Sequence, residues 1–296
     1  MKKLQYRIEL LLVRTMLAIL RRLGPVVASN LGGFLARSIG PLLPVTRTGD
    51  ANLRMAMPEL DAAGRSRVLR DVWDNLGRTA AELPHIAQLE RTERGPGWEI
   101  ENAEIVHALA AQGGPAILVS GHIGNWELLP KAAAHFGIRL SSFYRAAANP
   151  AVDQTIMRLR TSVVGEGVPN FAKGSQGARA ALAHLGRGGF LGMLVDQKMN
   201  DGIAAPFFGR PAMTAPAAAA FALRYRCPLV PAHVERIGPA RLRLVVDPPM
   251  VLPDTGDRQA DLLCVTTEIN AILERWIRAR PGEWLWLHRR WPKETL

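Results

Sequence analysis

The sequence predicts an α/β fold in which helices flank a mixed, largely parallel central sheet. Two observations point to this class. From residue 98 onward, short apolar runs with the length of buried strands alternate with stretches whose apolar residues recur at helical spacing. The 296 residues, 48% of them hydrophobic, suffice for one large domain with a sizeable core, and they contain no internal repeat. Such alternation is typical of layered α/β domains.

The expected elements follow one another in a regular order. Residues 50–89 have a helical pattern, and the alternation of strands and helices comes after them. Strands are expected at residues 116–119, 139–144, 190–195, 229–235 and 242–246, and helices at residues 126–136, 149–164, 175–185, 214–226 and 258–278. Ligands of such folds gather at the carboxyl ends of the strands. Polar residues that follow these strands are therefore the first candidates for a functional site.

The N-terminal region predicts membrane-associated helices. Residues 10–20 are strongly apolar but contain Arg14, and the charge-free run 23–36 contains glycines and a proline. Neither run reaches the roughly 18 to 20 uncharged residues of a spanning helix, and no signal-peptide cleavage site follows the first run. We therefore expect residues 1–44 to form amphipathic helices in or on a bilayer, ahead of a larger domain at 45–296. A single short span and an ordinary buried hairpin are the alternatives.

The charge balance points to an anionic partner. Lys and Arg total 37 against 26 Asp and Glu, which gives a formal net charge of +11. The dense basic runs and aromatic–basic motifs of nucleic-acid-binding proteins are missing from the sequence. Basic residues instead alternate with apolar ones, as at residues 14–22 and 284–291, which suits the boundary between lipid head groups and acyl chains. We expect a membrane surface as partner and no nucleic acid. The two cysteines, Cys227 and Cys264, lack zinc-ligand spacing, and we expect no metal.

The segment 115–127 carries the strongest functional signal, with the sequence Pro-Ala-Ile-Leu-Val-Ser-Gly-His-Ile-Gly-Asn-Trp-Glu. His122 follows a buried-strand run, and Glu127 lies five positions further along. A histidine beside a carboxylate that fixes its tautomer is a general base for a hydroxyl group. His85 and Glu90 have the same spacing, but no strand precedes them. We interpret that second pair as a surface histidine near a surface acid.

Two other segments follow predicted strands. Asp196 comes directly after the run 190–195, and the loop 207–211 leads into the next helix. Both segments are expected to converge with His122 at one edge of the sheet. Helix capping or turn formation is the alternative role for Asp196. Arg160 lies in the helix expected at residues 149–164, and the alternative to a functional role there is an ordinary solvated position.

Five ordered blocks make the chain resemble the bacterial lipid A late acyltransferases, relatives of the glycerolphosphate and lysophospholipid acyltransferases. The blocks are residues 121–127, 143–145 with 149–150, 194–197, 207–216 and 281–291. They extend over nearly the whole chain, and together they are far more specific than the spacing of a histidine and a glutamate. One departure is Gly121, where many members of the family have asparagine.

The resemblance implies a glycerolphosphate acyltransferase-like fold and transfer of a fatty acyl group from acyl carrier protein to a hydroxyl of a lipid A precursor. It places the reaction at the cytoplasmic face of the inner membrane. It implies no cofactor, because acyl carrier protein is a co-substrate, and we expect a monomer. By motif, the catalytic pair falls on His122 and Glu127. The expected substrate-binding residues are Arg160 (with Arg158 as the alternative), Asp196, Arg145, Gly209 and Arg210.

The expected chemistry suits these residue types. His122 would take the hydroxyl proton and return it to the thiolate, while Glu127 would hold the imidazole and stabilise its cation. Arg160 or backbone amides near residues 121–124 would face the developing oxyanion. The alternatives are another acceptor (a lysophospholipid, ornithine lipid or glycolipid), a coenzyme A donor, or a catalytically inert membrane-surface scaffold. A hydrolase is disfavoured because no Gly-x-Ser-x-Gly motif occurs.

Overall fold

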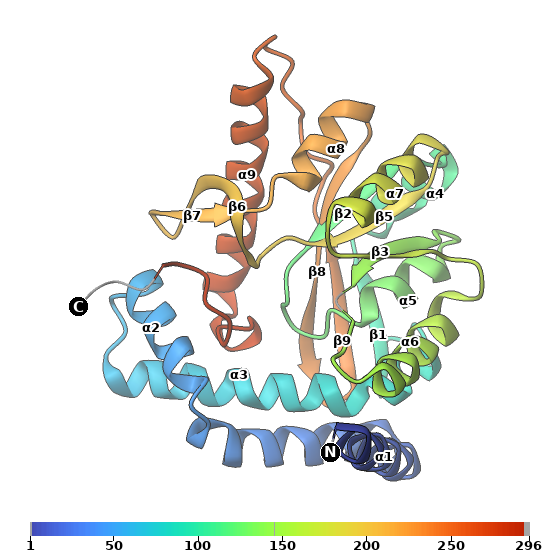
Figure 1. Cartoon of the computed structure of the whole chain (residues 1–296), viewed down its shortest axis with the longest axis vertical. Helices are drawn as coiled ribbons and strands as arrows, with labels where there is room; N and C mark the ends of the chain where they lie inside the picture. The colour runs from blue at the N-terminus through green and yellow to red at the C-terminus, as the bar shows by residue number, and fades with distance from the viewer. Residues whose placement is uncertain (1, 145, 293–296) are drawn as a thin grey trace.

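A seven-stranded sheet forms the centre of the protein, with helices on both of its faces (Figure 1). The structure, a computed structural model, describes residues 2–144 and 146–292. The strand order is β1-β9-β8-β2-β5-β3-β4, and all neighbours are parallel except β8 and β9. The strands of this sheet are β1 (Gly97–Glu101), β2 (Ala116–Ser120), β3 (Leu140–Tyr144), β4 (Asn170–Ala172), β5 (Phe190–Leu194), β8 (Leu229–Gly238) and β9 (Arg241–Val246). The predicted α/β fold with a mixed, largely parallel sheet is confirmed.

The helices form two layers because side chains alternate between the faces of each strand. Ile117 and Val119 of β2 share one hydrophobic cluster with α7, α8 and α9, whereas Ala116 and Leu118 share the other with α4 and α5. Burial on both faces explains why β2 is a continuous apolar run. The helices are α1 (Lys2–Ile39), η1 (Gly40–Leu42), α2 (Thr46–Ala56), α3 (Ala62–Glu82), η2 (Leu83–Gln88), α4 (Ala103–Gln112), α5 (Leu128–His135), α6 (Pro150–Val164), α7 (Ser175–Gly186), α8 (Ala217–Tyr225), α9 (Arg258–Ala279) and η3 (Pro281–Glu283).

Several elements were not expected from the sequence. The edge strands β1 and β4 are short, and an antiparallel hairpin of β6 (Lys198–Phe207) and β7 (Arg210–Thr214) lies outside the main sheet. The helix expected at residues 214–226 begins only at Ala217, because Thr214 still pairs within this hairpin. These strands carry little local signal, because they are short or largely exposed and the contacts that stabilise them come from distant segments.

Helix α1 bends in its middle and crosses α3 at close range. At Gly24, φ is 72° and ψ is 163°, outside the helical region, and Pro25 follows directly. After the bend, a Cβ atom on Gly32 would lie 2.4 Å from the carbonyl oxygen of Gly77. Small residues at this crossing therefore allow the two helix backbones to touch.

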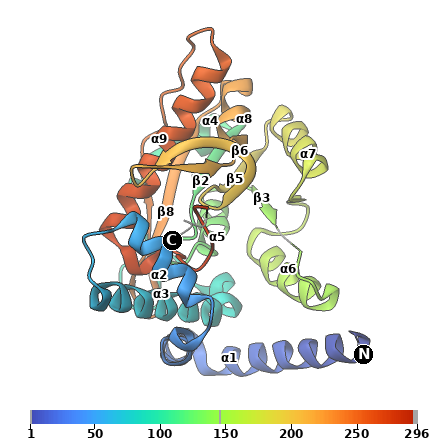
Figure 2. The ribbon, with the colours of Figure 1, turned by 60° about the vertical axis from the view of Figure 1, so that its left-hand side comes forward.

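The first half of α1 extends beneath α6 (Figure 2). Asn149, which caps α6, donates its Nδ2 hydrogen bond to the carbonyl oxygen of Tyr6 at 2.9 Å. Within the part of the chain that the structure describes, no helix is long and apolar enough to cross a membrane. The expected domain boundary between residues 44 and 45 falls between η1 and α2 and stays a prediction.

The C-terminal segment is part of the core. Four of its large side chains are at most 2% exposed: Trp284, Trp286, Arg290 and Trp291. Asn52 of α2 donates hydrogen bonds to the carbonyl oxygens of Trp286 and His288, and Arg290 donates to Met213 and Thr214 of β7, so the segment lies between α2 and the β6–β7 hairpin. The expectation that this stretch faces lipid is therefore wrong for these four side chains. Alternation of aromatic and basic residues does not distinguish a membrane boundary from a core in which the cations are hydrogen-bonded.

His85 is a second correction. The interpretation as a surface histidine is wrong, because His85 is buried in η2 and its Nε2 lies 3.0 Å from the carbonyl oxygen of Leu20 in α1. Glu90 is exposed, as expected, and pairs with Lys131. A neighbouring helix that is distant in sequence decides the burial of His85.

Candidate active site

His122 lies just beyond the carboxyl end of β2, and its partner is Asp196 from the end of the neighbouring strand β5. The Nδ1 atom of His122 donates to Oδ1 of Asp196, and the backbone amide of His122 donates to Oδ2, both at 2.8 Å. Trp284 Nε1 donates to the same Oδ2 at 2.8 Å. The side chain of Asp196 is 0% exposed, whereas that of His122 is 17% exposed. A buried carboxylate therefore holds a histidine whose side chain reaches the surface.

Asp196 is ionised despite its burial. Burial raises the pKa of its carboxyl group, but the charge and hydrogen bonds of His122 outweigh this effect, and the pKa lies well below its ordinary value. Because a carboxylate only accepts hydrogen bonds, Nδ1 of His122 carries the proton in this contact. In the neutral imidazole, Nε2 is then the basic nitrogen. The pair has the arrangement of a general base with its orienting carboxylate.

Glu127 binds Arg160 and not His122. Arg160 Nε donates to Oε2 of Glu127 at 3.0 Å, and Nη2 donates to Oε1 at 2.6 Å. These hydrogen bonds raise the pKa of the Arg160 guanidinium above its ordinary value. The expectation that Glu127 holds the imidazole is therefore corrected: adjacent parallel strands bring Asp196 to His122, while Glu127 at the start of α5 faces α6. A catalytic role for Glu127 stays a prediction.

The turn between His122 and Glu127 needs its glycines. Gly124 has a φ of 57°, and a Cβ there would lie 1.8 Å from the carbonyl oxygen of Val234. A Cβ on Gly121 would lie 3.0 Å from Leu273 and 3.4 Å from Asp196. A side chain at position 121 would therefore crowd Leu273 of α9, whereas its contact with Asp196 would be an ordinary van der Waals contact.

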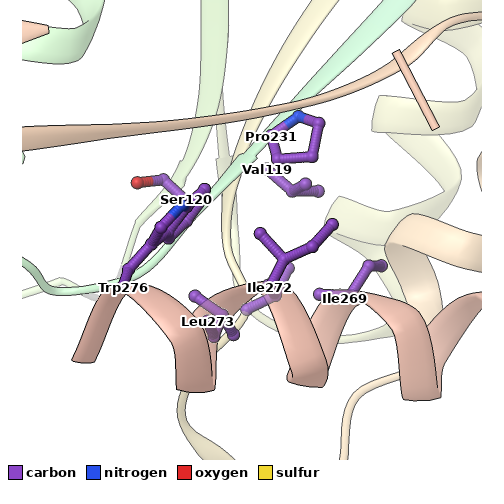
Figure 3. A pocket seen from close by; sticks show the side chains of 8 residues that line it. Val119, Ser120, Pro231, Ile269, Ile272, Leu273 and Trp276 are labelled. Atoms are coloured by element: carbon purple, nitrogen blue, oxygen red, sulfur yellow. The ribbon is translucent and has the colours of Figure 1, made fainter. Parts of the chain in front are cut away.

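The floor of the site is apolar. Figure 3 shows Ile272, Leu273 and Trp276 of α9 facing Val119 and Pro231 in the sheet. These side chains close the space beneath the end of β2. They pack against the end of the strand that leads to His122.

The C-terminal segment completes the site. Leu285 N donates to the carbonyl oxygen of His122, and Gly124 N donates to that of Glu283, both at 3.0 Å. The His288 ring lies 6.4 Å from the His122 ring between centroids. Burial lowers the pKa of His288, and within the described chain neither of its ring nitrogens has a hydrogen-bond partner. From the sequence, Trp284 was expected to face lipid rather than the site, and no role was expected for His288. The only signal that could have placed them here was their position in the block 281–291.

Three other residues were expected to bind substrate: Arg145, Gly209 and Arg210. Arg145 lies outside the described residues. Gly209 lies in the turn between β6 and β7, and Arg210 is the first residue of β7, where its Nε donates to the carbonyl oxygen of Met55 in α2 at 3.2 Å. Arg158 is exposed, so the arginine that meets Glu127 is Arg160. Substrate binding by Gly209, Arg210 and Arg145 stays a prediction.

The fold and the site together define a class: an α/β protein with an acid–base histidine at a strand end and no serine nucleophile hydrogen-bonded to it among the described residues. A family model described as "bacterial lipid A biosynthesis acyltransferase" matches residues 1–293. The chain belongs to this family of acyltransferases.

Two further comparisons add little to this assignment. No curated protein matches the chain significantly. Among solved structures, the chain is similar to the crystal structure of the 1-acyl-sn-glycerophosphate acyltransferase PlsC from Thermotoga maritima. The identity is 12%, the match covers 84% of this chain and 99% of that chain, and the TM-score is 0.38.

Proposed function

We propose that this acyltransferase moves a fatty acyl group from the thioester of acyl carrier protein to a hydroxyl of a lipid A precursor, at the cytoplasmic face of the inner membrane. The observation that carries the proposal is the His122–Asp196 pair, in which a buried carboxylate orients an accessible imidazole. Family membership supports the reaction class and the lipid acceptor.

In the proposed reaction, Nε2 of His122 takes the proton of the acceptor hydroxyl as the oxygen attacks the thioester carbonyl carbon. The carbon–oxygen bond forms and the carbonyl becomes an oxyanion. The carbon–sulfur bond then breaks, and the thiolate receives the proton from Nε2. Asp196 stabilises the imidazolium between these two steps, as in a hydrolase triad without its serine.

Arg160 is the proposed positive charge of the site. Its two hydrogen bonds to Glu127 fix the plane of the guanidinium, and its side chain remains 39% exposed. A guanidinium held in this way suits an oxyanion or a phosphate group. In this proposal Glu127 acts by positioning Arg160, and Asp196 acts by positioning His122.

Helix α1 supports a membrane location. Its outer surface combines exposed apolar side chains with exposed cations, among them Arg7, Arg14, Arg21 and Arg22. The apolar side chains of its first half are Leu4, Ile8, Leu11, Leu12, Met16 and Ile19, each at least 49% exposed. A surface of this kind suits the interface of an anionic bilayer.

The test is transfer of a labelled acyl group from acyl carrier protein to a purified lipid A precursor. His122→Ala should lower turnover about 10² to 10⁴-fold, the usual cost of losing a general base. The matched control is His107→Ala, since His107 is an exposed histidine of α4. A folded His122→Ala protein whose turnover equals that of His107→Ala would contradict the proposal.

A further inference from the structure

Glu82, the last residue of α3, is 0% exposed and accepts four hydrogen bonds. Ser29 Oγ of α1 donates to its Oε1 at 2.6 Å, and Asn125 Nδ2 donates to its Oε2 at 2.7 Å. Arg236 Nη1 and the amide of Ala240 donate to Oε1 at 2.5 and 3.0 Å. A carboxylate buried this deeply requires such partners, so each donor is held in a defined place.

One of these donors belongs to the turn that carries the site. Asn125 lies between His122 and Glu127, and its Oδ1 accepts the backbone hydrogen bond of Glu127 at 3.3 Å. The side chain of Asn125 therefore links Glu82 to Glu127 of the Glu127–Arg160 ion pair by two hydrogen bonds.

The same face of α3 supports the turn a second time. Asn75 and Thr79 are spaced so that they share a helix face with Glu82. Asn75 Nδ2 and Thr79 Oγ1 both donate to the carbonyl oxygen of Gly124, at 3.0 and 3.2 Å. Residues 124–127 therefore take their position from the buried polar face of α3.

On its other side this network ends in α1, the helix whose outer surface is exposed and apolar. Ser29 is fully buried just after the bend at Gly24. Its hydroxyl is the point at which α1 contacts Glu82 directly. The path of hydrogen bonds from α1 to the site is therefore Ser29, Glu82, Asn125 and Glu127.

We infer that Glu82 is a positioning residue that couples the seating of α1 on α3 to the geometry of the turn 124–127. Through this network, α1 on the membrane surface and the ion pair of the site are held in one arrangement. The effect on turnover rests on the proposed acyl transfer, whereas the effect on the turn does not.

The experiment compares Ser29→Ala with a matched control, Ser38→Ala. Ser38 is an exposed serine of the same helix that bonds the carbonyl oxygen of Phe34 in its own helix. Hydrogen exchange is measured on the amides of residues 122–128, together with kcat and KM for both substrates in the presence of anionic vesicles. Ser29→Ala removes the hydrogen bond to Glu82 and the 3.3 Å hydrogen bond that Ser29 Oγ accepts from Arg78 Nη1. It should speed exchange in this segment several-fold and lower kcat about fivefold with unchanged KM, the size of effect expected from a typical intramolecular hydrogen bond. Ser38→Ala should change neither.

Two further variants keep the outcome decisive. Glu82→Gln should speed exchange in residues 122–128 more than Ser29→Ala does; because it leaves Arg236 without its counter-charge, it is compared only as a folded protein. Asn125→Ala should speed exchange at Glu127 while the packing of α1 on α3 is unchanged. Equal exchange of residues 122–128 in Ser29→Ala and Ser38→Ala would overturn the inference. An inactive wild-type protein would contradict the proposed function alone, because the exchange comparison would still decide the coupling.

Discussion

Replacing Asp196 by asparagine should lower acyl transfer about 10³ to 10⁴-fold, because the amide would favour the wrong tautomer of His122. Three donors meet the carboxylate, Nδ1 of His122 on Oδ1 and two further N–H groups on Oδ2, each at 2.8 Å. Asparagine offers one acceptor oxygen. With that oxygen at the position where two donors meet, its NH₂ group faces Nδ1, and the imidazole proton must move to Nε2. The nitrogen that should accept the hydroxyl proton would then already carry one.

The opposite orientation of the amide is less favourable. It would leave the backbone amide of His122 and Nε1 of Trp284 facing an NH₂ group, and an unpaired buried donor costs about 1–3 kcal/mol. Loss of catalysis should therefore come with a smaller loss of stability. Turnover should be followed by single-turnover transfer of a labelled acyl group, and the free energy of unfolding by urea titration. Asp201→Asn, at an exposed position of β6, is the matched control.

The pH dependence of stability provides a second readout of Asp196. Burial raises the pKa of Asp196, but the charge and hydrogen bonds of His122 lower it by more than burial raises it. The folded pKa is therefore depressed below the unfolded value of about 3.9. A depressed carboxyl pKa stabilises the fold above the unfolded pKa, and this contribution is lost as pH falls below about 4 toward the folded pKa. Asp196→Asn should lack this loss. A folded Asp196→Asn protein with more than about a tenth of wild-type turnover would refute the assignment.

Three further predictions concern the rest of the site and its surroundings. Glu127→Gln keeps one of the two hydrogen bonds to Arg160, so it should lower kcat/KM less than Asp196→Asn and leave the pH–rate profile in place; a shifted profile would show that Glu127 acts on His122 after all. Leu11→Ser with Leu12→Ser should weaken flotation with anionic liposomes without altering thermal unfolding, because both side chains are more than 60% exposed; unchanged flotation would exclude this face of α1 as an anchor. The +11 protein should use an acyl group on acidic acyl carrier protein faster than the same group on coenzyme A, and the difference should narrow as the Debye length falls from about 10 Å at 0.1 M to about 3 Å at 1 M salt. Equal rates at every salt concentration would contradict a carrier-protein donor.

Local sequence determined much of the fold. The runs that became β2 and the first six residues of β8 are buried on both faces, so their apolar residues are continuous and easily recognised. The run that became β5 is equally apolar, although alternate residues of it are only partly buried or exposed. The edge strands and the β6–β7 hairpin lack that burial and were not predicted. His122 was identified because a single histidine follows such a run at a glycine-rich turn. These features depend on neighbours in the sequence, which a pattern records.

Only the tertiary structure decided which side chains meet. Asp196 is the partner of His122 because β2 and β5 are adjacent in the sheet, and no spacing along the chain encodes that order. Glu127 follows His122 by five residues, yet the start of α5 turns it toward Arg160. The C-terminal segment has the composition of a membrane boundary, but its tryptophans are buried against α2 and the β6–β7 hairpin. Sequence alone determined the strands and the candidate base, because these follow from local burial and backbone preference; strand order and packing chose the partners, because they depend on contacts between residues far apart in the chain.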